Sequence, residues 1–146
     1  MCSSDLQLAL TKMLKAAGCD LIDCSTGQTV PQQRPLYGRM FQAPFADWVR
    51  NEVGIATMTV GAITSADQVN TLLASGKADL VALGRPHLAN PYFTLQASAW
   101  YQHEAQFWPP QYLSGKDQAL RNAPREREEL TELRLRARPA SHEIKS

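Results

Sequence analysis

Hydrophobic residues recur in one repeating order along the first half of the chain: an amphipathic helix, a glycine and a short apolar strand. The first helix is expected over about residues 6–17, where apolar residues at helical spacing share one face, and Gly18 ends it. That face consists of Leu6, Leu10, Met13, Leu14 and Ala17. A short apolar run over residues 20–24 then predicts a buried strand.

The same order returns twice. A helix opened by Pro44 and closed by Gly54 precedes the apolar strand 55–60. The tetrapeptide Ser65–Gln68 has the form of a capping box, and the helix that it starts leads to the strand 79–83. Parallel neighbouring strands need a crossover connection, which each helix provides. The pattern therefore predicts an α/β fold with a parallel sheet.

The second half of the chain loses this repeat. Asn90-Pro91 predicts the start of a helix that carries apolar residues over 93–101, and Trp108–Pro110 is expected to break it. The segment Tyr112–Gly115 then reads as a turn or docking loop. Residues 116–146 are mostly charged, with leucines among arginines and glutamates. This composition favours a solvated helical tail, with an interaction tail as the alternative.

Two of the predicted strands end beside glycines, at Gly61 and at Gly84-Arg85. A glycine lets an anion approach the backbone N–H groups closely, and an adjacent arginine adds a bidentate donor. In a (β/α)₈ barrel, the loops after strands 7 and 8 form the usual phosphate site. These residues therefore predict a phosphate-bearing cofactor; the alternative is a surface arginine that merely follows a strand. Because a complete barrel takes roughly 250 residues, a chain of 146 residues is expected to be part of a larger protein.

Composition and charge exclude several classes of partner. The formal net charge is +1 and 44% of the residues are hydrophobic, so neither nucleic acid nor an anionic membrane surface is an expected partner. No apolar run approaches the ~18 residues of a spanning helix, and the chain does not begin with a signal-peptide pattern. A cytoplasmic protein without a metal site is expected. Neither the cysteines nor the histidines have metal-ligand spacing: Cys2, Cys19, Cys24, His87, His103 and His142.

Residues 1–6 are interpreted as a non-native leader. Back-translated, the segment from Cys2 to Leu6 fits the end of a widely used sequencing adapter, whereas Ser4 could instead cap an ordinary helix. The predicted organisation is then a leader over residues 1–6, a partial barrel over 7–115 and a charged tail over 116–146.

Four segments, taken in order, resemble the C-terminal half of the old yellow enzyme family. They are Asp20–Gly27, Pro44–Asp47, Val60-Gly61 and Gly76–Arg85. Members of this family are FMN-dependent NAD(P)H oxidoreductases with a (β/α)₈ barrel. The resemblance covers about residues 8–115 and implies a partial TIM barrel that runs from about helix 5 to strand 8 and helix 8.

A finer resemblance concerns one branch of that family. The stretches Tyr37–Gln42 and Trp108–Gln118 look most like the reductase-like domain that is fused behind a flavin monooxygenase in salicylyl-CoA and anthraniloyl-CoA hydroxylases. An intact protein of this kind would act on a small molecule, either an enone or an aromatic CoA thioester.

The resemblance also assigns cofactor-binding residues, position by position. Gly84 and Arg85 match the family's FMN phosphate-binding pair after strand 8, and Gly61 matches the glycine after strand 7 that meets the same phosphate. Ser25 lies at the end of strand 6, which passes near the flavin. The resemblance implies non-covalent FMN with NAD(P)H as reductant. It assigns no catalytic residue to this chain, because the family's catalytic groups would precede residue 1.

The connection from Thr26 to Ala43 is long for a link between a strand and a helix. Arg34, Tyr37 and Arg39 could line the substrate entrance there, and the alternative is that they are solvated loop residues. One subclass of the family projects an arginine into the neighbouring subunit of a homo-oligomer. The matching position here follows Gln111-Tyr112 and holds Leu113-Ser114, so that arginine is not matched.

Three hypotheses about function follow. The favoured one is part of an FMN-dependent NAD(P)H oxidoreductase, stand-alone or fused to an aryl-CoA monooxygenase, that contributes the phosphate site and is inactive alone. The second is a non-catalytic fragment that folds as an assembly partner. The third is another phosphate-binding barrel, such as an isomerase.

Overall fold

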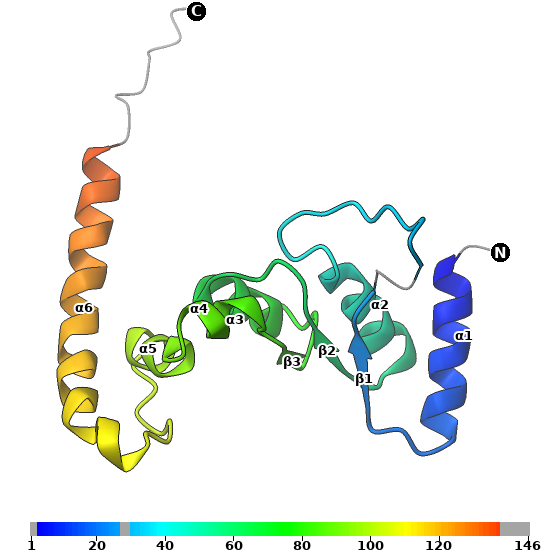
Figure 1. The fold of residues 1–146 in the computed structure, drawn as a ribbon, viewed down its shortest axis with the longest axis horizontal. Helices are drawn as coiled ribbons and strands as arrows, with labels where there is room; N and C mark the ends of the chain where they lie inside the picture. Colours follow the sequence, from blue (N-terminus) through cyan, green and yellow to red (C-terminus); the bar gives the residue numbers. More distant parts are fainter. Residues whose placement is uncertain (1–2, 27–29, 138–146) are drawn as a thin grey trace, which may run out of the picture. The chain divides into compact units, whose positions relative to one another are not determined.

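The computed structural model describes residues 3–26 and 30–137 (Figure 1). The chain divides into two compact units, Met1–Ala89 and Asn90–Ser146, and each is considered by itself. The predicted division at residue 115 lies inside the second unit and stays a prediction. The leader interpretation stays a prediction too, and Met1 and Cys2 lie outside the described residues.

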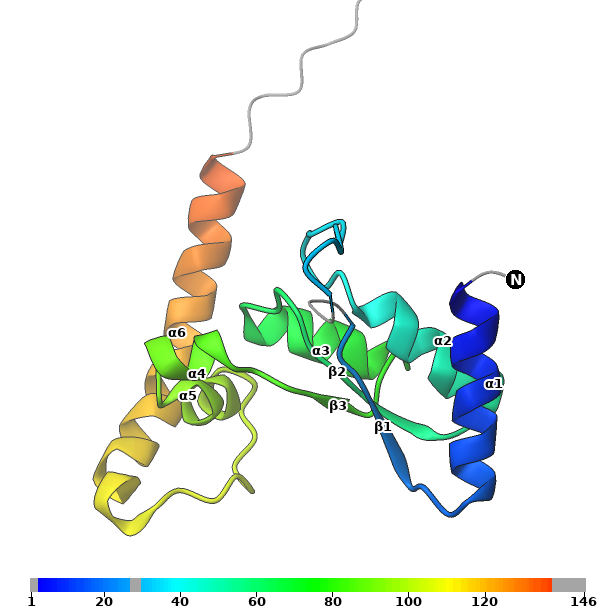
Figure 2. The ribbon, with the colours of Figure 1, turned by 45° about the vertical axis from the view of Figure 1, so that its right-hand side comes forward.

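The first unit alternates helices with strands, as the repeating pattern predicts. Its described strands form a three-stranded parallel sheet in the order β1-β2-β3, which confirms the α/β class (Figures 1 and 2). A short helix over Arg85–Ala89, separated from the last strand by residues 82–84, was not predicted. The elements are α1 (Ser3–Ala16), β1 (Leu21–Cys24), α2 (Ala43–Val53), β2 (Ala56–Thr59), α3 (Ala66–Ala74), β3 (Leu80–Val81) and α4 (Arg85–Ala89).

The predicted signals for helix ends are confirmed. Gly54 ends α2 in the left-handed conformation, with φ 68° and ψ 38°, and its N–H donates to the carbonyl of Arg50. Ser65 caps α3, since its hydroxyl accepts a hydrogen bond from the Gln68 N–H at 3.3 Å. The Gln68 side chain accepts in return from the Thr64 N–H at 2.8 Å, one residue before the position expected in a capping box.

The strands are shorter than predicted. The run expected over 79–83 pairs as a strand only at Leu80 and Val81, against Met58 and Thr59 of β2. β3 has one partner strand within the described residues, and the chain turns into α4 from Gly84 onward. An apolar run marks the length of a buried segment, whereas a strand extends only as far as a neighbour pairs with it.

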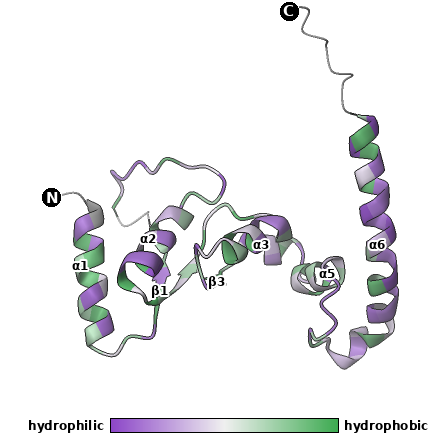
Figure 3. Cartoon of the chain, turned by 180° about the vertical axis from the view of Figure 1, so that it is seen from behind, coloured by the Kyte–Doolittle hydropathy of each residue, from purple (hydrophilic) through white to green (hydrophobic). Residues whose placement is uncertain are grey.

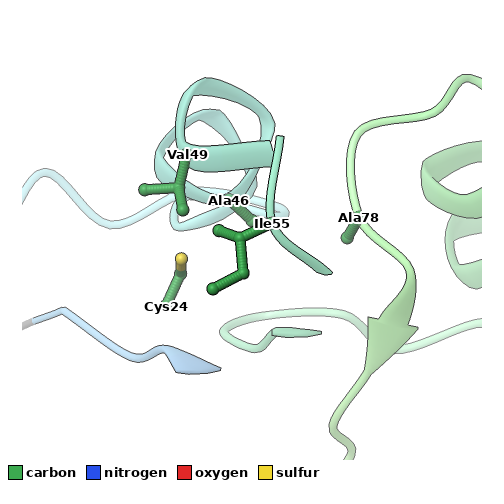
Figure 4. Packing of buried hydrophobic residues seen from close by; sticks show 5 residues of the cluster. All are labelled: Cys24, Ala46, Val49, Ile55 and Ala78. Atoms are coloured by element: carbon green, nitrogen blue, oxygen red, sulfur yellow. The ribbon is translucent and has the colours of Figure 1, made fainter. Parts of the chain in front are cut away.

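Helices cover one face of this sheet. Cys24, Thr59 and Val81 are register partners across the three strands, so their side chains point to the same face. Helix α2 packs against β1 and β2 on this face, and α3 packs against β3. Figure 4 shows the Cys24 thiol directed toward Ile55 and α2, within the buried cluster of Cys24, Ala46, Val49, Ile55 and Ala78. Burial, with the charge of Asp23 as the lesser cause, raises the pKa of the Cys24 thiol to about 11.

The opposite face of the sheet lacks a helical cover among the described residues. Met58 pairs with Leu80, whose side chain is 51% exposed, and with Asp23, which is also exposed. A strand whose two faces were both covered would bury these positions. Within the described residues, β1 and β3 are the edge strands of this sheet.

The apolar face of α1 is also exposed. Figure 3 shows green, hydrophobic segments along α1. Such a stripe ordinarily faces a core, yet Leu6, Leu10 and Met13 are 64%, 54% and 70% exposed. The helix turns another face inward. Leu8 packs against the buried cluster, and the Lys15 ammonium group donates to the carbonyls of Val53 and Gly54 at the end of α2.

The second unit consists of α5 (Phe93–Trp100), a 3-10 turn at Pro110–Tyr112 and α6 (Leu113–Arg136). Helix α5 ends at Trp100, so the predicted break at Trp108–Pro110 is wrong: the helix stops before that segment, and Pro110 starts the 3-10 turn. Helix α5 begins later than predicted, because the Asn90 carboxamide accepts from the Tyr92 N–H at 3.1 Å and forms a turn before the helix. The prediction of a turn over Tyr112–Gly115 is wrong, since α6 starts at Leu113.

The prediction of a charged helix in this part of the chain is confirmed by α6. Helix α6 contains Pro124 in its interior. Proline has no N–H group, so the carbonyl of Leu120, four residues earlier, loses its helical partner. The Gln102 carboxamide donates to that carbonyl at 3.0 Å and to the Ala99 carbonyl at 2.8 Å. One side chain on the α5–α6 connection thus replaces the hydrogen bond that the proline removes. Farther along, the Arg127 guanidinium lies 5.3 Å from the centre of the Trp100 ring.

Candidate functional site

The predicted cofactor-binding residues all follow the carboxyl ends of the three strands. Because the strands are parallel, those ends lie at one edge of the sheet. Ser25 follows β1 directly, Gly61 comes two residues after β2, and Gly84-Arg85 begins three residues after β3. The last residues of the strands are in register with one another. The topology therefore brings the connections that carry these four residues to a common edge.

The charge of these connections is uniform. Residues 25–42, 60–65 and 82–90 contain three arginines, Arg34, Arg39 and Arg85, and no aspartate or glutamate. A carboxylate at this edge would repel an anionic ligand, whereas unpaired guanidinium groups attract one. The composition of the three connections is therefore compatible with an anionic ligand.

Gly61 is confined by its neighbours. Its φ is 108°, a backbone conformation that residues with a side chain rarely adopt. A Cβ atom there would lie 2.5 Å from Gln42 Nε2 and 2.7 Å from Phe41 Cε1. Only glycine fits this position without a shift of the Gln42 and Phe41 side chains.

Gly84 differs from Gly61 in this respect. A Cβ atom at Gly84 would meet nothing within 4 Å, and Gly84 is exposed. The Gly84 carbonyl accepts from the N–H groups of His87 and Leu88, which starts α4. The space at this position is open enough for a ligand, and sterics alone do not require the glycine.

Arg85 is the first residue of α4 and is exposed. Within residues 3–26 and 30–137, its guanidinium group takes part in no hydrogen bond or ion pair. The charge is therefore available to a ligand. Whether it converges with Gly61 on one bound phosphate stays a prediction.

Ser25 and the candidate substrate residues lie in the connection after β1. Ser25, Arg34 and Arg39 are exposed, and Tyr37 is 66% exposed. The Tyr37 ring packs edge-to-face on Phe41, with 5.3 Å between the ring centres. Since Phe41 is itself against Gly61, the aromatic pair joins this connection to the end of β2.

Sequence reasoning missed Gln42 and Phe41, the two side chains that confine Gly61. It also missed a backbone hydrogen bond of 3.3 Å from the Met40 N–H to the Ala62 carbonyl. Both of these residues have positive φ, 57° for Met40 and 51° for Ala62. No local pattern marks such contacts, because they join segments about twenty positions apart.

Two other kinds of site were tested on the same residues. No group of three or more histidine, cysteine, aspartate or glutamate residues in the described part of the chain could hold a metal ion. Among the helices of residues 3–26 and 30–137, none combines the length and the apolar composition that crossing a membrane requires.

Residues 4–104 match the sequence model of the NADH:flavin oxidoreductase / NADH oxidase family. The chain belongs to this family. The match includes Ser25, Gly61, Gly84 and Arg85, and it ends before α6. It confirms the resemblance to old yellow enzymes and, at the level of the family, the flavin and nicotinamide cofactors that the resemblance implied.

Three relatives are similar to this chain over part of their length. The chain is 43% identical over 91 residues to an NADPH dehydrogenase of Halalkalibacterium halodurans, which is 62% of this chain and 27% of the relative. It is 46% identical over 87 residues to an NADPH dehydrogenase of Geobacillus thermodenitrificans, or 60% of this chain and 25% of the relative. The NADPH dehydrogenase of Listeria innocua is 42% identical over 91 residues, again 62% and 27%. The chain thus spans about a quarter of the length of these relatives.

Proposed function

We propose that this chain supplies the FMN phosphate site of an FMN-dependent NAD(P)H oxidoreductase. One observation carries the proposal: Ser25, Gly61 and Gly84-Arg85 follow three register-aligned parallel strands at an edge whose connections contain arginines and no carboxylates. This edge lies inside the segment that matches a flavin oxidoreductase family.

The residues present fit a phosphate group. The space at Gly84 is open, whereas the Cβ side of Gly61 is filled by Gln42 and Phe41. Arg85 is exposed, and its guanidinium group has no partner among the described residues. Arg85 would hold the phosphate oxygens by charge-assisted hydrogen bonds, and the glycine backbones would approach them from the adjacent strand ends. FMN, when bound, would carry hydride between NAD(P)H and a second substrate. This chain's own share is to bind and orient the phosphate end of the cofactor.

We propose further that the sheet is part of a (β/α)₈ barrel. The free edges of β1 and β3, the uncovered sheet face and the exposed stripe of α1 all favour more strands beside these. The chain alone would then lack the groups that hold the flavin ring and polarise a substrate, and would be inactive. On this account residues 116–146 are a charged C-terminal tail and not part of the barrel sequence.

The substrate side is proposed from the connection after β1. The exposed residues Arg34, Tyr37 and Arg39 would line an entrance for a small molecule, either an enone or an aromatic CoA thioester. An aromatic CoA thioester gives both Arg34 and Arg39 a role, because the phosphates of its CoA moiety would pair with the two guanidinium groups. It corresponds to a chain that is the C-terminal part of an aryl-CoA monooxygenase fusion.

The experiment compares FMN with riboflavin, which lacks the phosphate. Purified chain is titrated with each flavin, and binding is followed by the quenching of flavin fluorescence. The proposal predicts tighter binding of FMN, and no NADPH oxidation when an activated enone is added. Equal affinities for FMN and riboflavin would contradict the proposed phosphate site. Oxidation of NADPH by the isolated chain would contradict the proposal that it is inactive.

A further inference from the structure

Gln42 has a buried side chain whose role the helix beside it does not explain. The residue directly precedes α2 and is only 6% exposed. A polar residue at this position commonly caps the helix, but the Gln42 side chain makes no capping hydrogen bond. A buried carboxamide needs other hydrogen-bond partners.

The two ends of this side chain reach two different strand ends. Gln42 Oε1 accepts a hydrogen bond from the backbone N–H of Thr26, the second residue after β1. Gln42 Nε2 and Cγ lie against Gly61, at 2.5 Å and 3.1 Å from the position of a Cβ atom there. A single side chain therefore spans from the carboxyl end of β1 to that of β2.

The backbone around Gln42 is held in an unusual form. Met40 donates its N–H to the Ala62 carbonyl at 3.3 Å, and the Ala43 N–H donates to the Met40 carbonyl at 2.9 Å. Met40 and Ala62 both have left-handed φ values, 57° and 51°. Such residues persist only where the surrounding structure fixes them, and they cluster at functional sites. The connections after β1 and β2 are thus joined at a defined point.

We infer that Gln42 is a positioning residue for the phosphate site. It keeps the backbone of Thr26 and the backbone of Gly61 at a fixed separation, so that the connections after β1 and β2 present an anion site already formed before binding. The inference rests on the proposed function. Gln42 itself is assigned no contact with the phosphate.

The test uses the full chain with Gln42→Met, Gln42→Glu and a matched control, Gln32→Met. Gln32 is an exposed glutamine of the same connection. Methionine keeps the length of the side chain but removes the acceptor for the Thr26 N–H. Glutamate keeps the acceptor and adds a negative charge beside Gly61. Two quantities are measured: the amide hydrogen exchange rate of Thr26 by NMR, and the ratio of FMN to riboflavin affinity.

The expected result separates the two variants. Gln42→Met should speed Thr26 exchange at least about tenfold and reduce the FMN-to-riboflavin ratio about tenfold, with riboflavin affinity unchanged. Gln42→Glu should keep Thr26 protected and still reduce the ratio, through repulsion of the phosphate. Gln32→Met should change neither quantity. If Gln42→Met does not fold, Gln42→Asn takes its place, because asparagine keeps the carboxamide but is one methylene shorter and cannot reach both Thr26 and Gly61. The same two changes are then expected.

Two outcomes would overturn the inference, and they differ in meaning. A preference for FMN that stays at the wild-type level in Gln42→Met, although Thr26 exchanges faster, would show that Gln42 does not position the site, while the proposed function stands. A wild-type chain that binds FMN no more tightly than riboflavin would contradict the proposed phosphate site itself. The positioning role of Gln42 would then be refuted together with it.

Discussion

Replacing Gly61 with alanine should destabilise the first unit, whereas the same replacement at Gly84 should not. The methyl group at Gly61 would lie 2.5 Å from Gln42 Nε2 and 2.7 Å from Phe41 Cε1, and the φ of 108° disfavours any side chain. Overpacking in a filled site costs about 1–3 kcal/mol, and an unfavourable backbone conformation costs a similar amount. We expect Gly61→Ala to lower the free energy of unfolding by about 2–4 kcal/mol, since the ends of the Gln42 and Phe41 side chains can relax in part.

Gly84→Ala serves as the matched control, because a Cβ atom there meets nothing within 4 Å and φ is not left-handed. Alanine reduces the conformational freedom of the unfolded chain, so the free energy of unfolding should stay constant or rise by up to about 1 kcal/mol. The assay is urea-induced unfolding in a background with Trp100 and Trp108 replaced by phenylalanine. Trp48 of α2 is then the only tryptophan, and its fluorescence reports on the first unit. Equal effects of the two substitutions at constant m value would refute the packing described around Gly61.

Two further predictions concern stability. The Asp79 carboxylate accepts a hydrogen bond from the Thr57 N–H at 2.9 Å. This bond is the main cause of the lowered pKa of Asp79, and the Arg50 guanidinium is a lesser cause. The contribution of Asp79 to the free energy of unfolding is therefore complete above the unfolded pKa of about 3.9, and it is lost as the pH falls through the lower pKa of the folded state. Asp79→Asn should cost at most about 1 kcal/mol at pH 7, given its solvent exposure, and nothing at a pH below both pKa values; a urea-measured cost that does not change with pH would contradict this. Gln102→Ala should destabilise the second unit by about 1 kcal/mol, but by less in a Pro124→Ala background, where the helix regains its own hydrogen bond; a double-mutant cycle without coupling would argue against this replacement.

Much of the first unit could be predicted from local signals. Pro44, Gly54 and the capping box at Ser65 act through the backbone of their own neighbourhood, so a single sequence shows where the helices begin and end. The repeat of helix and strand then fixes parallel pairing, because each helix serves as a crossover. From this parallel pairing alone, the sequence predicts that Gly61 and Gly84-Arg85 lie at the same edge of the sheet.

The rest depends on contacts that no local pattern encodes. The apolar stripe of α1 is visible in the sequence, but its exposure is not, because periodicity shows which face is apolar and not what lies against it. The Gln42 side chain spans two strand ends, and its role becomes visible only once both connections are folded. The helical start of α6 at Leu113 was missed because Gly115 and the preceding prolines favour a turn locally, while packing against α5 stabilises the helix.

The most direct test of the phosphate site is the phosphorus-31 NMR signal of FMN in the presence of the chain. In the wild type, the phosphate resonance should shift on titration, and inorganic phosphate at high concentration should reverse the shift. Arg85→Ala should weaken FMN binding roughly 10- to 100-fold through loss of a charge-assisted contact. The control Arg134→Ala, at an exposed arginine of α6 outside the family match, should leave the titration unchanged. A titration that Arg85→Ala does not alter would contradict the account.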